Sequence, residues 1–309
     1  MKGVANRLIA IALIAIGLTF TTDVFLTSAN ILNVLRQASL TFLIASGLTL
    51  TILTAGLDLS VGANLGLSAC LAATVMKSTG SIAAGVAAGL GFGAIVGVLN
   101  GLMITLLKLP PFIATYGMLW TLNGLTYWFM GGDTIHGFSP GFRRLGSGYW
   151  LGVPVPIYVM AAFLVAGWIF TRYTTSGREV YAIGANREAA RLSGVPVRAR
   201  LILVYLMSGA MAGLAAVVYL ARLNSAEADI GEALTLPAIA AVLIGGTSLF
   251  GGAGSLSGTL VGAVTLTLVV NGMNLLAVDA NWQPLVTGVI VILAVWIDVI
   301  TRQRAEARV

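Results

Sequence analysis

The sequence is poor in charge, cysteine and histidine, and each scarcity excludes a class of protein. Only 9% of its 309 residues are charged, whereas soluble domains carry about 25%, and 58% of the residues are hydrophobic. The one cysteine, Cys70, has no partner in the chain for a disulfide, and the one histidine, His136, excludes two-histidine metal motifs. We therefore expect a membrane protein that binds no metal ion.

The familiar catalytic motifs are also missing. No Gly-Lys dipeptide occurs, so the chain has no phosphate-binding loop and no ATPase activity of its own. Residues 137–141 match the G-x-S-x-G pattern of serine hydrolases, but Pro140 follows the serine and lacks the N–H that an oxyanion needs. We predict that the chain is not an enzyme and holds no cofactor.

Long apolar runs predict an all-α, polytopic membrane protein with about ten transmembrane helices in one domain, residues 1–309. Each run approaches the roughly 20 residues that cross a bilayer. The expected spans are 8–26, 34–57, 59–76, 81–107, 112–130, 155–171, 201–221, 235–250, 256–277 and 284–300. An even number of spans puts both termini on one side with the basic stretch 172–200, and the positive-inside rule makes that side cytoplasmic. The same rule explains the net charge of +6 without a nucleic-acid partner.

Residues 172–200 form the longest polar interruption, with six of the 17 basic residues and two acidic ones. Within it, Asn186 is a suitable N-cap and Gly194 a suitable stop, which predicts a two-turn helix over 186–193. A short capped helix between two spans on the cytoplasmic side indicates a docking element.

Polar residues inside apolar spans are functional candidates because they are costly without partners. Asp58 and Ser60, in the break between the second and third spans, either cap the following helix or take part in gating and solute passage. Asn123, Asn271 and Asn274 either bind neighbouring helices or line a path for an uncharged, hydroxyl-rich solute. The depth of the break stays open.

Glycines and a weak repeat add to this picture. Five glycines recur at every fourth position between Gly85 and Gly101, which lets another helix backbone approach closely. Residues 48–66 and 242–260 are faintly alike, which suggests an internal repeat of the kind found in transporters.

Four stretches resemble the membrane permease of ribose-type ABC importers, a family that carries ribose, other monosaccharides and related solutes. They are residues 53–62 (LTAGLDLSVG), 177–195 (GREVYAIGANREAARLSGV), 238–252 (AIAAVLIGGTSLFGG) and 271–276 (NGMNLL). They follow the order of the family over most of the chain, and Leu57 stands where the family pattern has isoleucine.

The resemblance implies a permease in the bacterial inner membrane, paired with a second permease subunit as a homodimer or with a sister chain. It also implies a cytoplasmic ABC ATPase that binds ATP and magnesium, and a periplasmic sugar-binding protein. Contact with the ATPase would fall to Gly184, Asn186, Arg187, Glu188, Ala189, Arg191, Leu192 and Gly194. The alternatives are an ion-coupled secondary transporter and a passive channel for small polar solutes.

Overall fold

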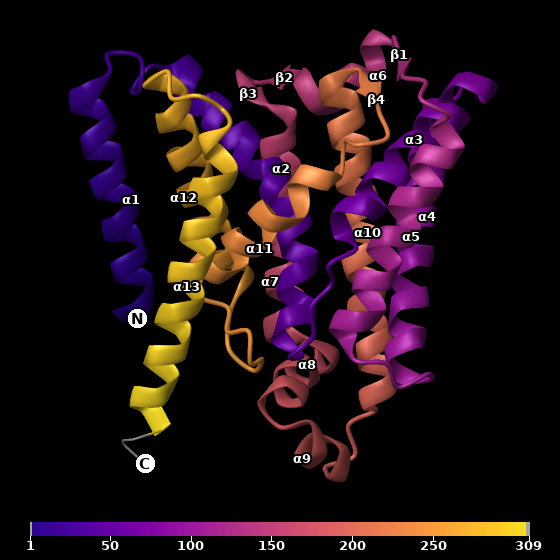
Figure 1. Ribbon diagram of the computed structural model, residues 1–309, viewed down its shortest axis with the longest axis vertical. Coiled ribbons are helices and arrows are strands. Elements are labelled where there is room, and N and C mark those ends of the chain that lie inside the picture. The colour runs from indigo at the N-terminus through magenta and orange to yellow at the C-terminus, as the bar shows by residue number, and fades with distance from the viewer. Residues whose placement is uncertain (1, 307–309) are drawn as a thin grey trace.

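The computed structural model describes the backbone of residues 2–306 and the side chains of residues 11–296, 299 and 300. The chain folds mainly into helices that run along one common direction (Figure 1). The longer helices are α1 (Lys2–Thr21), α2 (Ser28–Leu53), α3 (Val61–Thr79), α4 (Ile82–Thr105), α5 (Pro111–Met130), α7 (Val155–Tyr173), α10 (Val197–Leu223), α12 (Leu256–Leu275) and α13 (Trp282–Glu306). The shorter ones are α6 (Pro140–Ser147), α8 (Thr175–Ala185), α9 (Arg187–Leu192), η1 (Glu232–Leu234) and α11 (Thr235–Ile244).

Four two-residue strands lie at the end of the molecule opposite α9 (Figure 1). β1 (Ile135–His136) pairs antiparallel with β4 (Ser225–Ala226), and β2 (Tyr149–Trp150) pairs antiparallel with β3 (Val153–Pro154). Together with α6 they connect the helix ends and form an ordered cap there.

Two sets of four helices repeat one packing arrangement. In the first set, α3 packs on α4 and α5, and α10 contacts α3 and α4. In the second set, α11 packs on α12 and α13, and α2 contacts α11 and α12. The end of α10 (Leu223) lies 170 residues after the end of α2 (Leu53). The end of α12 (Leu275) likewise lies 170 residues after the end of α4 (Thr105). Matching helices run in opposite directions (Figure 1), so the two sets form an inverted repeat, a plan common among transporters.

The predicted repeat is therefore present, but its predicted register is wrong. The end of α2 and the start of α3, within 48–66, correspond to the end of α10 and the start of α11 rather than to 242–260. At the centre, the starts of α3 and η1 meet so closely that a Cβ on Gly231 would overlap the carbonyl group of Gly62. The faint likeness of 48–66 to 242–260 reflects shared glycine-rich breaks, not equivalent positions.

The predicted eighth span, 235–250, is wrong as a continuous helix. α11 ends at Ile244, and a helix of 10 residues is about 15 Å long, half the thickness of a bilayer core. Among the described residues, five helices are long and apolar enough to cross a membrane, namely α2, α4, α7, α10 and α12. The chain is an all-helical polytopic membrane protein, and the total of ten crossings remains a prediction.

The start of α1 and the end of α13 point toward the end of the molecule that carries α8 and α9 (Figure 1). The predicted cytoplasmic location of both termini remains a prediction. Met1 and residues 307–309 themselves lie outside the described residues.

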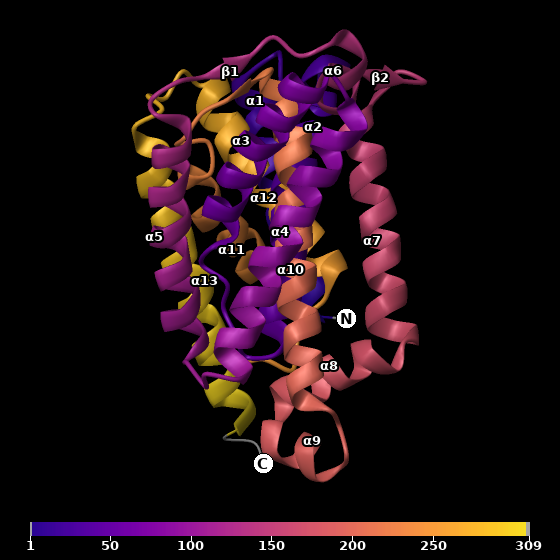
Figure 2. The same cartoon turned by 90° about the vertical axis from the view of Figure 1, so that its right-hand side faces the viewer.

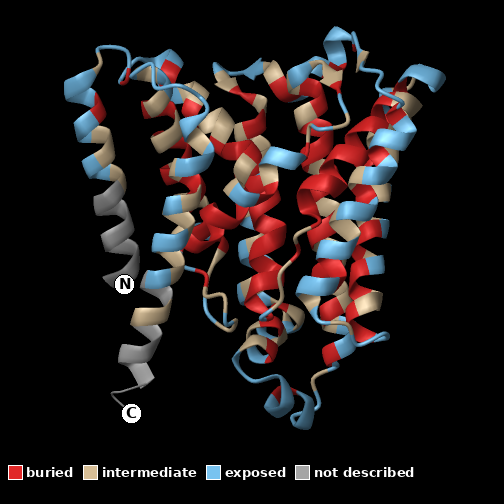
Figure 3. Ribbon diagram, viewed as in Figure 1, coloured by how far each residue is buried: buried red, intermediate tan, exposed pale blue. Residues whose placement is uncertain are grey.

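The buried core runs through the middle of the bundle, where α2, α3, α4 and α10 meet (Figure 3). The predicted close approach along the glycines of α4 is confirmed against α10. A Cβ at Gly97 would overlap the carbonyl oxygen of Tyr205, whereas Gly91 on the same helix has no atom within 4 Å of its Cβ position.

The Gly97→Ala variant is therefore expected to lose about 1–3 kcal/mol of stability through overpacking. The matched Gly91→Ala variant is expected to unfold at the wild-type temperature or slightly above it. Thermal unfolding of both variants in detergent measures the difference. Equal midpoints for the two variants would contradict the proposed α4–α10 contact.

Candidate coupling segment and central polar cluster

α8 and α9 project from one end of the bundle (Figure 2). The predicted two-turn helix is confirmed as α9, with Asn186 as its N-cap: its side chain accepts a hydrogen bond of 2.9 Å from the Ala189 backbone N–H. Just past its end, Gly194 has a φ of +84°, a left-handed value that favours glycine. Local sequence signals alone therefore specify both ends of this helix.

α9 presents nearly all of its surface to solvent. Only Ala190 is buried, and the side chain of Leu192 is 73% exposed, an unusual position for a large apolar residue. Arg191 donates hydrogen bonds of 3.0 and 2.6 Å to the two carboxylate oxygens of Glu188, and this holds the pKa of Glu188 below its ordinary value. Arg187 and Ala189 are exposed as well. The exposed face of α9 thus combines an apolar tip with a fixed ion pair, a combination suited to a protein partner.

α8, by contrast, is anchored to the bundle. Its first turn is capped by Thr174, and Tyr181 donates a hydrogen bond of 3.0 Å to the carbonyl oxygen of Gly254. At its other end a Cβ on Gly184 would overlap both Leu53 and Gly252, and these two residues are joined by a backbone hydrogen bond of 2.9 Å. Gly184 is therefore a packing residue, and α8 links α9 directly to the end of α2 and to the loop before α12.

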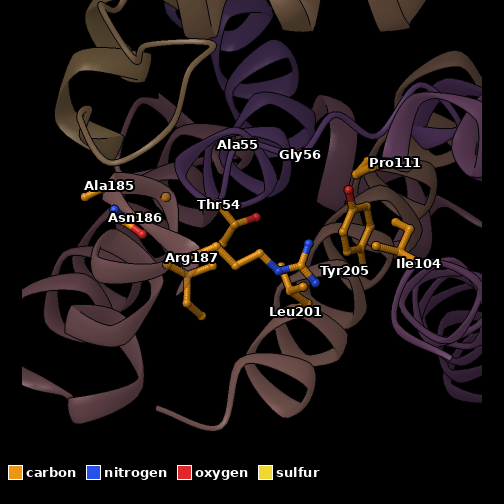
Figure 4. Close-up of a pocket in the computed structure, with 12 residues that line it drawn as sticks. Thr54, Ala55, Gly56, Ile104, Pro111, Ala185, Asn186, Arg187, Leu201 and Tyr205 are labelled. Atoms are coloured by element: carbon orange, nitrogen blue, oxygen red, sulfur yellow. The ribbon is translucent and has the colours of Figure 1, made fainter. Parts of the chain in front are cut away.

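A cavity of about 260 Å³ lies where α8, α9 and α10 meet the end of α2 (Figure 4). Arg187 extends across it toward Tyr205, whose buried hydroxyl has no hydrogen-bond partner among the described residues. The cavity is bounded by Thr54 and Gly56, at the break before α3. It leaves room for this junction to change shape.

Comparison with known proteins places the chain among membrane permeases. Residues 30–295 match the family model described as the permease component of the branched-chain amino acid transport system. The ribose import permease protein RbsC of Bacillus subtilis is 43% identical over 276 residues, covering 89% of this chain and 86% of the relative. RbsC of Escherichia coli K12 is 41% identical over 93% of this chain and 91% of the relative.

The chain belongs to the family of ribose-type ABC importer permeases. The D-allose transport system permease protein AlsC of Escherichia coli K12, 35% identical over 93% of this chain and 88% of the relative, extends the likeness to a second sugar. No solved structure matches the chain. The resemblance read from the four sequence stretches is confirmed.

In this permease the carboxylate in the break between α2 and α3 is buried in the protein interior. Asp58 is 1% exposed, and its carboxylate accepts hydrogen bonds from the Ser60 backbone N–H at 3.1 Å and from the Ser60 hydroxyl at 2.6 Å. Ser208 of α10 donates to it at 2.9 Å, and Asn100 of α4 approaches at 3.5 Å. Ser60 stands at the N-cap position of α3, but its hydroxyl binds Asp58 and does not cap the helix. We call these four residues the Asp58 cluster; it joins the break to α4 and α10.

The three predicted pathway asparagines lie on two helices, with Asn271 and Asn274 one turn apart on α12 and Asn123 on α5. Asn271 of α12 is buried and exchanges amide hydrogen bonds of 3.1 and 2.8 Å with Asn30 of α2. Asn274 accepts a bond of 2.9 Å from Gln283 near the start of α13, and Asn123 is half-buried on α5. Their arrangement is that of interhelical contacts, so a shared pathway through them remains a prediction.

Sequence reasoning missed α8 and its anchor. The signal for α8 was available, because Thr174 follows the last apolar residues of α7 and threonine is a good N-cap. The contact of Gly184 with Leu53 and Gly252 had no local signal, since the three residues are far apart in the sequence.

Proposed function

We propose that this permease imports a monosaccharide, ribose or a close relative, into the bacterial cytoplasm across the inner membrane, using ATP hydrolysed by a partner ABC ATPase. A periplasmic sugar-binding protein would deliver the solute, and a second permease subunit, in a homodimer, would complete the membrane domain. The observation that carries this proposal is α9: a capped, exposed helix held at one end of the bundle by an anchored α8. ATP and magnesium would bind only to the ATPase.

Coupling follows from where α8 is anchored. A groove on the ATPase that moves with nucleotide state would move α9, with Leu192 and the Glu188–Arg191 pair as its contacts. α8 would carry the displacement to Leu53 and Gly252, beside the breaks that precede α3 and α12. ATP can shift the permease between two states only because the ATPase binds α9 differently in each of them.

The choice of ribose rests on relatives. RbsC of Bacillus subtilis and of Escherichia coli are named for ribose import, and AlsC for D-allose transport. An ion-coupled transporter is less well supported, because Asp58 is the one fully buried acid among the described residues and hydrogen-bond donors surround its carboxylate.

The test is ATP hydrolysis by the permease reconstituted in lipid vesicles with its ATPase and binding protein. D-Ribose is expected to raise turnover only when all three proteins are present, with D-allose and D-galactose as comparison sugars. Failure of the permease to associate with the ATPase, or turnover that no sugar changes, would contradict the proposed function. A vesicle in which only the binding protein is omitted is the control.

A further inference from the structure

A large opening in the permease lies away from α9, in the opposite half of the bundle. It is a groove of about 660 Å³ between α2, α10, α11, α12 and α13, and η1 closes one side. This volume falls in the range of small-molecule sites, about 300–1,000 Å³. We call it the outer groove, and it includes none of the predicted pathway residues.

Polar side chains from all the surrounding segments except α11 converge on the outer groove. They are Gln37 and Thr41 of α2, Tyr219 and Arg222 of α10, Glu232 of η1, Thr267 of α12, and Gln283 and Thr287 of α13. Leu266, Val270 and Ile292 add apolar surface. Amides, hydroxyls and charged groups beside an apolar wall match a sugar ring, which has hydroxyls at its edge and C–H groups on its faces.

Several of these polar groups have no partner within the protein. In the described part of the chain, the side chains of Gln37, Arg222 and Thr267 make no hydrogen bond, and Thr267 is only 5% exposed. Among the described residues, Arg222 and Glu232 face the same groove without forming an ion pair with each other, and the Glu232 carboxylate accepts a hydrogen bond of 2.9 Å from the Tyr127 hydroxyl. Unpaired polar groups in an apolar bundle are costly, so they are expected to bind something.

The two halves of the inverted repeat differ at the position of the outer groove. Thr267 and Gly97 occupy equivalent positions in the repeat, because each lies eight residues before the end of its helix, α12 or α4. Gly97 is closed off by the backbone of Tyr205, whereas the side chain of Thr267 opens onto the groove. Of these two equivalent positions, the one in the half opposite α9 is open and the one in the half toward α9 is filled by α10.

We propose that the outer groove is a binding site within each permease subunit for a neutral, polyhydroxylated sugar ring. The opposite charges of Arg222 and Glu232 cancel, which favours an uncharged solute over a sugar acid or a phosphate. The groove opens on the side where a periplasmic binding protein would release its sugar. This inference rests on the proposed import function and adds the place in which the sugar first binds the permease.

Two cysteine variants on α12 test the site, and the chain suits this test because Cys70 is its one native thiol. In a Cys70→Ala background, Thr267→Cys is expected to react with a small water-soluble methanethiosulfonate, and the transported sugar is expected to slow that reaction about tenfold. Thr265→Cys is the matched control, because Thr265 is buried on the same helix, outside the groove, with its hydroxyl bonded to Val261 at 2.8 Å. It is expected to stay unreactive.

Each outcome decides the proposal. If D-ribose stimulates ATP hydrolysis but leaves the labelling rate of Thr267→Cys unchanged, the site is overturned while the import function stands. Reaction only with a lipid-soluble maleimide would show that lipid fills the groove, and it too would overturn the proposal. If no sugar stimulates hydrolysis, the import function fails and the site fails with it.

A transport measurement complements the labelling. Gln37→Leu removes an amide from the groove and is expected to lower sugar uptake by about tenfold. The reason is that a sugar hydroxyl would lose its hydrogen-bond partner in the groove, so the sugar would bind there less tightly. Wild-type uptake would count against the site.

Discussion

Replacing Glu188 by arginine is expected to abolish sugar-stimulated ATP hydrolysis while the permease still folds and inserts. The substitution removes the Glu188–Arg191 ion pair and leaves two positive side chains one turn apart on a six-residue helix. It also reverses a charge on the face that is proposed to contact the ATPase. A central contact of an interface can carry 2 kcal/mol or more, so the stimulation is expected to fall by about tenfold or more.

Two further variants separate recognition from helix stability. The double variant Glu188→Arg with Arg191→Glu restores an ion pair within α9 but exchanges the two charges. If the double variant also lacks sugar-stimulated ATP hydrolysis, the ATPase recognises the positions of the two charges. If stimulation returns, the ion pair acts by stabilising the helix. Asp133→Arg, a comparable charge reversal at an exposed residue two positions before β1, is the control and is expected to behave as wild type. Full stimulation in Glu188→Arg itself would refute the assignment of α9.

Replacing Asp58 by leucine is expected to cause the largest loss of stability. The leucine would remove the acceptor for the hydroxyls of Ser60 and Ser208 and for the Ser60 backbone N–H in a fully buried cluster. The Asn100 amide would keep the Ser60 hydroxyl as its acceptor, at 2.8 Å. Each buried donor left unpaired costs about 1–3 kcal/mol, so the total is expected to reach about 3 kcal/mol or more. Thermal unfolding and the yield of monodisperse protein in detergent measure the loss.

The Asp58→Asn variant distinguishes a structural role from a role in solute passage. Asparagine keeps one carbonyl oxygen for Ser60 and has nearly the same shape, so it is expected to fold at close to the wild-type temperature. Wild-type sugar uptake in this variant would assign Asp58 to loop geometry alone. Normal folding with lost uptake would instead show that the carboxylate takes part in transport. An Asp58→Leu permease as stable as the wild type would refute the Asp58 cluster as a structural element.

Signals that act over a few residues were readable from the sequence. Asn186 and Gly194 define α9 because a cap and a left-handed stop act within one or two turns of backbone. The apolar runs located the long helices for a similar reason, since a bilayer imposes the same requirement on each segment separately. The spacing of the glycines of α4 also predicted a close helix contact, but it did not identify α10 as the partner.

Positions that depend on distant residues were not readable. Hydropathy gave 235–250 as a span because its residues are apolar, but η1 and α11 start inside the bundle, where Gly231 meets Gly62. The register of the repeat was mistaken because helix packing, rather than local sequence, relates α2 to α10. Asn271 and Asn274, chosen for a pathway, bind side chains of other helices, and the outer groove had no local signature at all.

The sequence by itself determined the class of this protein: a helical membrane permease of the ribose type with a capped, exposed helix on one side. Each of these properties follows from composition, from local backbone preferences or from short motifs. The tertiary structure alone decided that Asp58 binds Ser208, that Gly184 contacts Leu53 and Gly252, and that Arg222, Glu232 and Thr267 face one groove. The physical reason is that apolar spans have similar surfaces, so only their packing in three dimensions selects which polar side chains meet.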